Sequence, residues 1–228
     1  LGDVYKRQSV FSVLLAHSQD FLFSFVLRYN IGDVEYWVRH KIDTKTTEYK
    51  KNNEVVNEAG MTYPNRIVCN YSGEDTRMWN NYYKKPNEDY MNSVRTAAAP
   101  DVLSMVYIDK TMWKYVLLCM LTTRNMNVAF DRFLKEKLHI ASDGINTVEM
   151  KLDEAKLRRW RAENQITLFL NQLRHRLGSN EVLASSNVED FNPNEDDARE
   201  LFNKFIGASQ VIDSLNIYYN QGLSLIHI

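Results

Sequence analysis

Apolar side chains in the first ninety residues follow two different periods. From Val10 to Asn30 they recur at helical spacing, which predicts one helix or two short ones. Ile31-Gly32-Asp33 is typical of a turn, and Val34–Ile42 then alternates between apolar and polar residues, as a half-buried strand does. Arg66–Tyr71 predicts a second short strand. The polar stretch Thr44–Asn57 fits either a return strand or a solvated helix.

The pattern that follows is mostly helical. Pro100 favours the start of a helix over Val102–Asp109, whereas Pro86 would break any helix around it. Met112–Leu121 is apolar nearly all round, which predicts a central buried helix, and Val128–Leu138 continues as an amphipathic helix. The side chains expected to be least accessible in the central helix are Trp113, Val116, Leu117 and Met120.

Capping residues indicate where the last helices begin and end. A long helix is expected over Asp153–Leu177, capped by its first residue and closed by Gly178. Asn192–Ile206 begins with the pattern of a capping box and predicts another helix. Val148–Leu152 alternates like a short strand, and Val211–Tyr219 fits a helix or a strand. The core stripe of the long helix is Ile166, Phe169, Leu170, Leu173 and Leu177.

Glycine and proline are scarce, with 8 and 4 residues in the chain of 228. This composition argues against a turn-rich β-sandwich and favours long helices. Together with the apolar pattern it predicts a mainly α fold with a small β component in the first ~90 residues (α+β), followed by a helical second half.

The two ends of the chain are related to each other. A back-translation of residues 223–228, read as its reverse complement, encodes Asp-Val-Tyr-Lys-Arg-Gln, which is the sequence of residues 3–8. The pattern resembles the inverted adaptor of transposase-based sequencing libraries. We therefore expect residues 1–8 and 223–228 to be adaptor scars that pack poorly. Between them, an α+β part (9–95) and a helical part (96–222) would form one continuous domain of a longer protein.

The net charge and the number of cysteines exclude few classes of protein. The formal net charge of −1 gives no whole-chain reason to expect nucleic acid, a membrane or an acidic partner. The most apolar stretch, Val10–Tyr29, is interrupted by His17 and Asp20, so no membrane span is expected. Two cysteines, Cys69 and Cys119, cannot form a disulfide framework and are compatible with a reducing, intracellular environment, while localisation itself is not predicted.

No cofactor and no metal are predicted. The chain lacks a G-x-S-x-G motif, a phosphate-binding loop and any close pair of histidines or cysteines at metal-ligand spacing. Asp190, Asn192, Asn194 and Asp196 alternate like the ligands of a calcium loop. However, Leu201 stands where the loop requires a bidentate glutamate, and a helix cap accounts for the same residues.

Charge is distributed unevenly between two neighbouring segments. Residues 151–176 carry a local charge of +4, and residues 181–200 carry −6. The basic segment could bind phosphates and stack a base on Trp160. The residues of this nucleic-acid interpretation are Arg158, Arg159, Arg161, Arg174 and Trp160. The alternative, which we favour, is that the acidic run folds back on these arginines or that the two segments form a subunit contact.

Arg132 and His139 are separated by six residues near the end of a predicted helix. This spacing resembles the Arg-to-His pattern of the HEPN family of helical ribonucleases, and the resemblance implies that the pair lies at the scissile phosphate. In the structural alternative, Arg132 is solvated and His139 is a favourable cation at a helix C-terminus.

The sequence favours a non-enzymatic structural or protein-interaction segment of a longer protein. Its partner would be another protein or the remainder of the parent chain. The 22 asparagines are typical of AT-rich genomes, as many viral ones are. The alternatives are a nucleic-acid-binding module that uses the basic helix 151–176 and, third, a HEPN-like helical ribonuclease.

Overall fold

The computed structural model describes residues 10, 21, 23–70, 79–137, 139, 144–179, 181–219 and 223–226. The chain forms two compact units. Unit 1 consists of Leu1–Cys69, Gly73–Asn87 and Leu103–Tyr107, and unit 2 consists of Asn70–Ser72, Glu88–Val102 and Ile108–Ile228. The predicted division at residues 95 and 96 stays a prediction.

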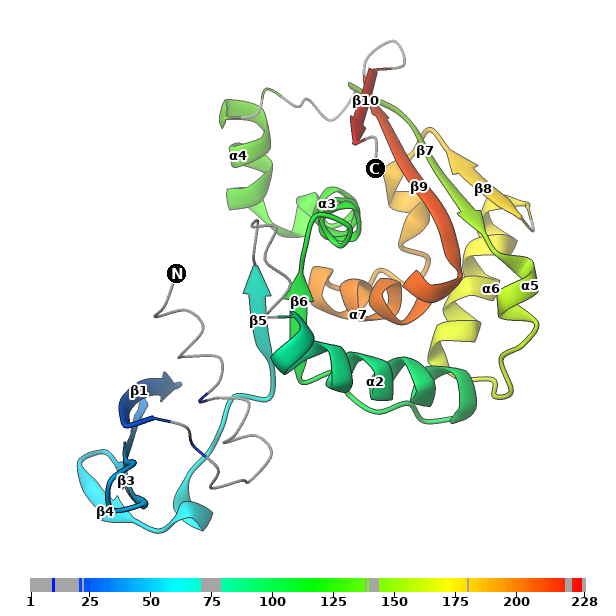
Figure 1. The fold of residues 1–228 in the computed structure, drawn as a ribbon. Coiled ribbons are helices and arrows are strands. Elements are labelled where there is room, and N and C mark those ends of the chain that lie inside the picture. The colour runs from blue at the N-terminus through cyan, green and yellow to red at the C-terminus, as the bar shows by residue number, and fades with distance from the viewer. Residues whose placement is uncertain are drawn as a thin grey trace. The chain divides into compact units, whose positions relative to one another are not determined.

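Four strands of unit 1 form an antiparallel meander (Figure 1). They are β1 (Phe25–Ile31), β2 (Val34–Lys41), β3 (Thr46–Lys51) and β4 (Glu54–Val56). Gly32 turns β1 into β2 with φ +58°, and Asn52 and Asn53 turn β3 into β4 with φ 48° and 65°. These left-handed values are the ones that two-residue hairpin turns require. The half-buried strand predicted from Val34 is therefore confirmed, and its inward residues include Tyr36 and Val38.

The prediction of a mainly α fold is wrong. Among the described residues, those from 23 to 70 lie mostly in strands and the helices are concentrated in the later part, so the fold is mixed α/β. Phe25–Asn30, expected in a helix, lies in β1, because apolar residues such as Phe25 and Leu27 at every second position pack on the meander core. Val26 between them is also apolar, although it is exposed. Because of Val26, the segment matches the spacing of a helix as well as the two-residue period of a strand. The rest of that predicted helix falls largely outside the described residues.

A second sheet in the chain pairs β5 (Ile67–Asn70) with β6 (Met105–Ile108). The strand predicted over Arg66–Tyr71 is thus confirmed at Ile67–Asn70, with Tyr71 outside the described residues, and the predicted helix over Val102–Asp109 is wrong. A helix begins only after this strand. Asp109 forms the turn before it, where its side chain accepts hydrogen bonds from the backbone N–H groups of Thr111 and Met112 at 2.8 and 3.0 Å. A short helical turn, η1 (Glu58–Gly60), follows the meander.

Pro86 does not break a helix, contrary to expectation. It is the third residue of α2 (Lys84–Thr96), close to the junction with a preceding π-helical turn, where the regular i to i−4 hydrogen bonding that proline disrupts is already interrupted. A π-helical turn, η2 (Trp79–Tyr83), leads into α2. Tyr83 is fully buried, and its ring centroid lies 5.1 Å from that of Tyr107.

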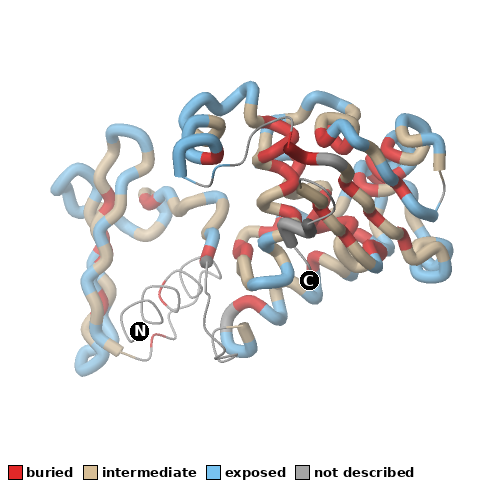
Figure 2. Tube along the Cα trace, turned by 90° about the horizontal axis from the view of Figure 1, so that it is seen from above, coloured by how far each residue is buried: buried red, intermediate tan, exposed pale blue. Residues whose placement is uncertain are grey.

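Unit 2 is built on an antiparallel sheet with the strand order β10-β9-β7-β8. The strands are β7 (Ile145–Leu152), β8 (Val182–Ser185), β9 (Ile212–Tyr219) and β10 (Leu223–Ile226). One face is buried, as Val148, Met150 and Leu215 show, and the other is only partly covered (Figure 2). Residues 223–226 pair with β9 through their backbone although we expected a poorly packed scar. Residues 1–8 lie outside the described residues, and the adaptor interpretation stays a prediction.

Three helices make up most of the helical core of unit 2: α3 (Trp113–Thr122), α6 (Gln165–Leu177) and α7 (Ala198–Ala208). The ring of Phe205 in α7 meets Phe169 of α6 edge to face at 5.2 Å and stacks on Tyr115 of α3 at 6.1 Å. Among the described residues, five further helical elements lie between or beside them. These are η3 (Arg124–Met126), α4 (Val128–Lys137), α5 (Glu154–Leu157), η5 (Val188–Phe191) and η6 (Ser209–Val211).

The central helix was placed correctly, but its buried face was not. In α3 the buried residues are Tyr115, Leu118, Cys119, Leu121 and Thr122. Trp113 is 43% exposed, and Val116, Leu117 and Met120 are only partly buried. A helix that is apolar nearly all round gives no periodic signal for its inward direction.

Two helix starts in unit 2 also differ from expectation. Asp153 caps only the short α5, and α6 begins later, where the Asn164 side chain accepts from the N–H groups of Ile166 and Thr167. The segment Asn192–Glu195 is a turn, and Asp197 caps α7 instead. The predicted stripe is confirmed as buried at Ile166, Phe169, Leu170 and Leu173, whereas its last residue, Leu177, is only partly buried.

Candidate interaction surface on α6

Helix α6 has a core face and a free face. Its apolar stripe packs inward, and Gly178 closes it in the left-handed conformation, with φ +67°. On the opposite side Leu168, Asn171 and His175 follow one another at helical spacing, and all three are exposed. Leu168 is 58% exposed, which is unusual for a leucine in the middle of an amphipathic helix.

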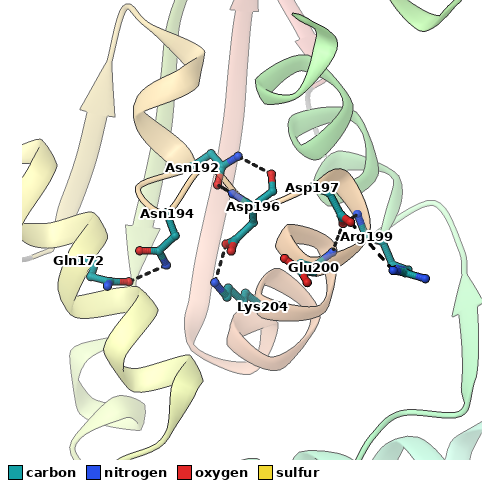
Figure 3. A network of polar contacts seen from close by, with 8 residues as sticks. All are labelled: Gln172, Asn192, Asn194, Asp196, Asp197, Arg199, Glu200 and Lys204. Atoms are coloured by element: carbon teal, nitrogen blue, oxygen red, sulfur yellow. Dashed lines mark hydrogen bonds and ion pairs between the residues drawn. The ribbon is translucent and has the colours of Figure 1, made fainter. Parts of the chain in front are cut away.

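A groove of about 650 Å³ separates this face from the turn that contains Pro193 and Asn194. Its α6 wall consists of Leu168, Asn171, Gln172, His175 and Arg176. The Asn194 Nδ2 donates to the Gln172 Oε1 at 2.9 Å, so one amide pair spans the two walls (Figure 3). We call this hollow the loop groove. It combines apolar side chains with amides that can both donate and accept.

A smaller cleft of about 230 Å³ lies on the other flank of α6. Its lining consists of Leu157, Trp160, Arg161, Ala162, Glu163, Thr167, Asn171 and Arg174. Asn171 lines both hollows, so they adjoin along the free face of α6. We call this hollow the tryptophan cleft, and the two hollows together the α6 surface.

Backbone and amide hydrogen bonds hold the wall of the tryptophan cleft in place. The Arg161 N–H donates to the Arg95 carbonyl at 2.8 Å. The buried Asn164 Nδ2 donates to the carbonyls of Val94 at 2.7 Å and Ala97 at 3.1 Å. These bonds tie the segment that precedes α6 to the end of α2. The predicted single helix over residues 153–177 is interrupted here, and this interruption creates the cleft.

The structure separates the predicted nucleic-acid residues into two groups. Arg158, Arg159 and Arg161 are exposed, and in the described part of the chain no carboxylate forms an ion pair with them. Arg174 is only 18% exposed at its side chain and pairs with Glu154. Trp160 is half-buried and lines the cleft with Arg161 and Arg174.

In the described part of the chain the acidic run forms no ion pair with the three exposed arginines, but it does fold back on the basic segment at Arg176. The alternative that we favoured therefore holds in part, and the subunit contact stays a prediction. Asp190 accepts from Arg176 Nε at 3.2 Å and from the Ser185 hydroxyl at 2.6 Å. Asp196 pairs with Lys204 at 2.5 Å (Figure 3). The carboxylate of Asp197 caps α7. These acids therefore stabilise their own loop and the two adjoining helices.

Arg132 and His139, the ribonuclease candidates, are both exposed. Arg132 lies on α4, whereas His139 lies beyond its end in a left-handed conformation, with φ 54°. The carbonyl of His139 accepts a hydrogen bond from the Tyr219 hydroxyl at 3.2 Å. Neither residue lines the α6 surface, and the catalytic role stays a prediction.

Among the described residues, no group of three or more His, Cys, Asp or Glu side chains could hold a metal ion. The calcium-like residues are engaged in the turn: Asn192 bonds twice with the backbone of Asp196, at 2.8 and 3.0 Å. In the part of the chain that the structure describes, no helix is long and apolar enough to cross a membrane. Both cysteines are buried, and burial raises the pKa of the Cys119 thiol.

No family model, no curated protein and no solved structure matches this chain. Its chemistry must therefore be judged from the α6 surface itself. Sequence reasoning identified Trp160 and the arginines but missed Leu168 and the loop groove. The signal was present, because Leu168 is the apolar residue of α6 that falls outside the core stripe.

Proposed function

We propose that unit 2 is a protein-interaction module that binds a segment of a partner protein, or of the remainder of its parent chain, on the α6 surface. The observation that carries this proposal is the exposed Leu168 in the wall of the loop groove. Exposed apolar side chains in a concave site with a few amides are typical of binding sites for other molecules. Asn171, Gln172 and Asn194 supply the amide groups, which match the donors and acceptors of a peptide backbone.

A selection from random peptides displayed on phage, with the full chain as target, tests this proposal. Leu168→Glu places a charge in the groove wall and should lower the affinity of selected peptides about tenfold or more. Val128→Glu is the matched control, because Val128 is 69% exposed on α4, outside the α6 surface. Peptides that bind both variants as well as they bind the wild type would overturn the proposal, as would the failure to select any peptide. Circular dichroism verifies that both variants are folded.

The second candidate is single-stranded nucleic acid. It is supported by the three exposed arginines without a carboxylate partner and by Trp160 beside them in an open cleft. Each arginine could contact a phosphate, and the indole could stack a base. Fluorescence anisotropy with oligothymidylate over a range of salt concentrations tests this candidate. Substitution of Arg158, Arg159 and Arg161 by alanine should weaken binding at every salt concentration and reduce the log–log salt slope by about 2.

A further inference from the structure

We infer that the partner segment is acidic: it places an apolar side chain against Leu168 in the loop groove and carboxylates against Arg158, Arg159 and Arg161 beside the tryptophan cleft. This inference rests on the proposed function and specifies the chemistry of the same surface. The juxtaposition that supports it has two sides: an apolar groove lies on one flank of α6, and Arg161 lines the cleft on the other flank. The exposed Arg158 and Arg159 precede Arg161 closely in the sequence.

The charges around α6 are largely paired, with one exception. Arg174 is neutralised by Glu154, Arg176 by Asp190, and Lys204 by Asp196. Lys156 pairs with Asp153 at 3.0 Å. The exception is formed by Arg158, Arg159 and Arg161. Among the described residues, these three arginines take part in no ion pair. Within the cleft lining their one acidic neighbour is Glu163, which is exposed. An excess of positive charge therefore remains on this flank.

An acidic peptide fits this charge distribution better than a nucleic acid does. A nucleic acid strand carries one negative charge on every phosphate, so some of its phosphates would meet Glu163 beside Arg161. A peptide can place its carboxylates only where the arginines lie.

The loop groove adds features that a phosphate backbone would not use. Leu168 and Pro193 offer apolar surface, and the amides of Gln172 and Asn194 already face each other across the groove. One hydrogen bond joins these two amides, and each side chain has further donor and acceptor capacity for an extended main chain. The apolar contact would provide affinity, and the acidic residues would provide orientation and a faster encounter.

Selected peptides provide the test. We expect the peptides that depend on Leu168 to be enriched in Asp and Glu. Arg158→Glu, Arg159→Glu and Arg161→Glu together should weaken their binding about tenfold or more, and added salt should weaken wild-type binding. The matched control reverses three exposed lysines outside the α6 surface and should leave binding unchanged. These lysines are Lys45, Lys51 and Lys110.

The possible outcomes distinguish a wrong assignment of the acidic partner from a wrong assignment of the interaction module. Peptides that require Leu168 but lack acidic residues and tolerate the arginine reversals would overturn the acidic partner and leave the interaction module standing. Loss of the Leu168 dependence would overturn both. Oligothymidylate that binds more tightly than any selected peptide, and displaces it, would replace the acidic partner with nucleic acid.

Discussion

The ring of Tyr219 lies directly over Gly144: a methyl group at this glycine would stand 2.0 Å from the Tyr219 Cε2 atom. No heavy-atom contact is tolerated at that distance, so the start of β7 depends on glycine for its packing against β9. Gly144→Ala should lower the free energy of unfolding by about 1–3 kcal/mol, measured by urea denaturation. In a Tyr219→Ala background the same substitution should cost much less. Equal costs in both backgrounds would contradict the contact.

Leu118, and not Leu117, should dominate the contribution of α3 to stability. Leu118 is fully buried, whereas Leu117 is only partly covered. Leu118→Ala should therefore lower the free energy of unfolding by about 2–5 kcal/mol. Leu117→Ala is the matched control, with a clearly smaller loss. A larger loss for Leu117 would restore the face that the sequence predicted.

His40 should make stability depend on pH. It is 3% exposed, its Nδ1 lies 3.0 Å from the Thr47 hydroxyl, and in the described part of the chain its buried Nε2 has no hydrogen-bond partner. Burial lowers the pKa of His40, so the folded state binds fewer protons than the unfolded state. Stability is then fully present above the unfolded pKa of about 6.5 and is lost as the pH falls below it.

Urea denaturation of wild type and His40→Gln over a pH series measures this effect. The wild type should lose more stability than the variant between about pH 7.5 and 5. The variant also controls for the carboxylates, which titrate in both proteins. Parallel pH profiles would show that His40 is accommodated in its charged form.

Asn164 should matter more to stability than its polar character suggests. Its side chain caps α6 and donates to two carbonyls at the end of α2. Asn164→Ala removes the cap and leaves those carbonyls without this donor, which should cost about 2–3 kcal/mol. Asn171→Ala, on the exposed face of the same helix, should change stability by less than about 0.5 kcal/mol. Urea denaturation of the two variants under the same conditions measures the difference in their free energies of unfolding.

Local patterns predicted the elements whose two faces differ in environment. β2 alternates because one side is buried, and the stripe of α6 appears at helical spacing for the same reason. The element type was predicted wrongly at β1, where the apolar residues match the spacing of a helix as well as that of a strand. The buried face was predicted wrongly in α3, because this helix carries apolar residues on all its sides. The prediction also failed at residues 158–164, because the bonds of Arg161 and Asn164 to α2 connect positions far apart in the sequence.

The candidate site was predictable only in part for the same reason. Trp160 and the arginines stood out by residue type, and the structure places Trp160, Arg161 and Arg174 in one cleft. The loop groove could not be foreseen, because it forms where Pro193 and Asn194 approach α6 from a distant part of the chain. The neutralising role of the acidic run was foreseen only in part: Asp190 pairs with Arg176 of the basic segment, whereas Asp196 pairs with Lys204 of α7.

The shortness of β4 and β8 has a consequence for self-association. Each is the outer strand on one side of its sheet, with three and four residues respectively. A strand this short presents few free N–H and C=O groups, which makes it a poor template for a strand from another chain. Aggregation through these two edges is therefore disfavoured. The molecule can expose an apolar groove on α6 while these sheet edges remain poor sites for edge-to-edge growth.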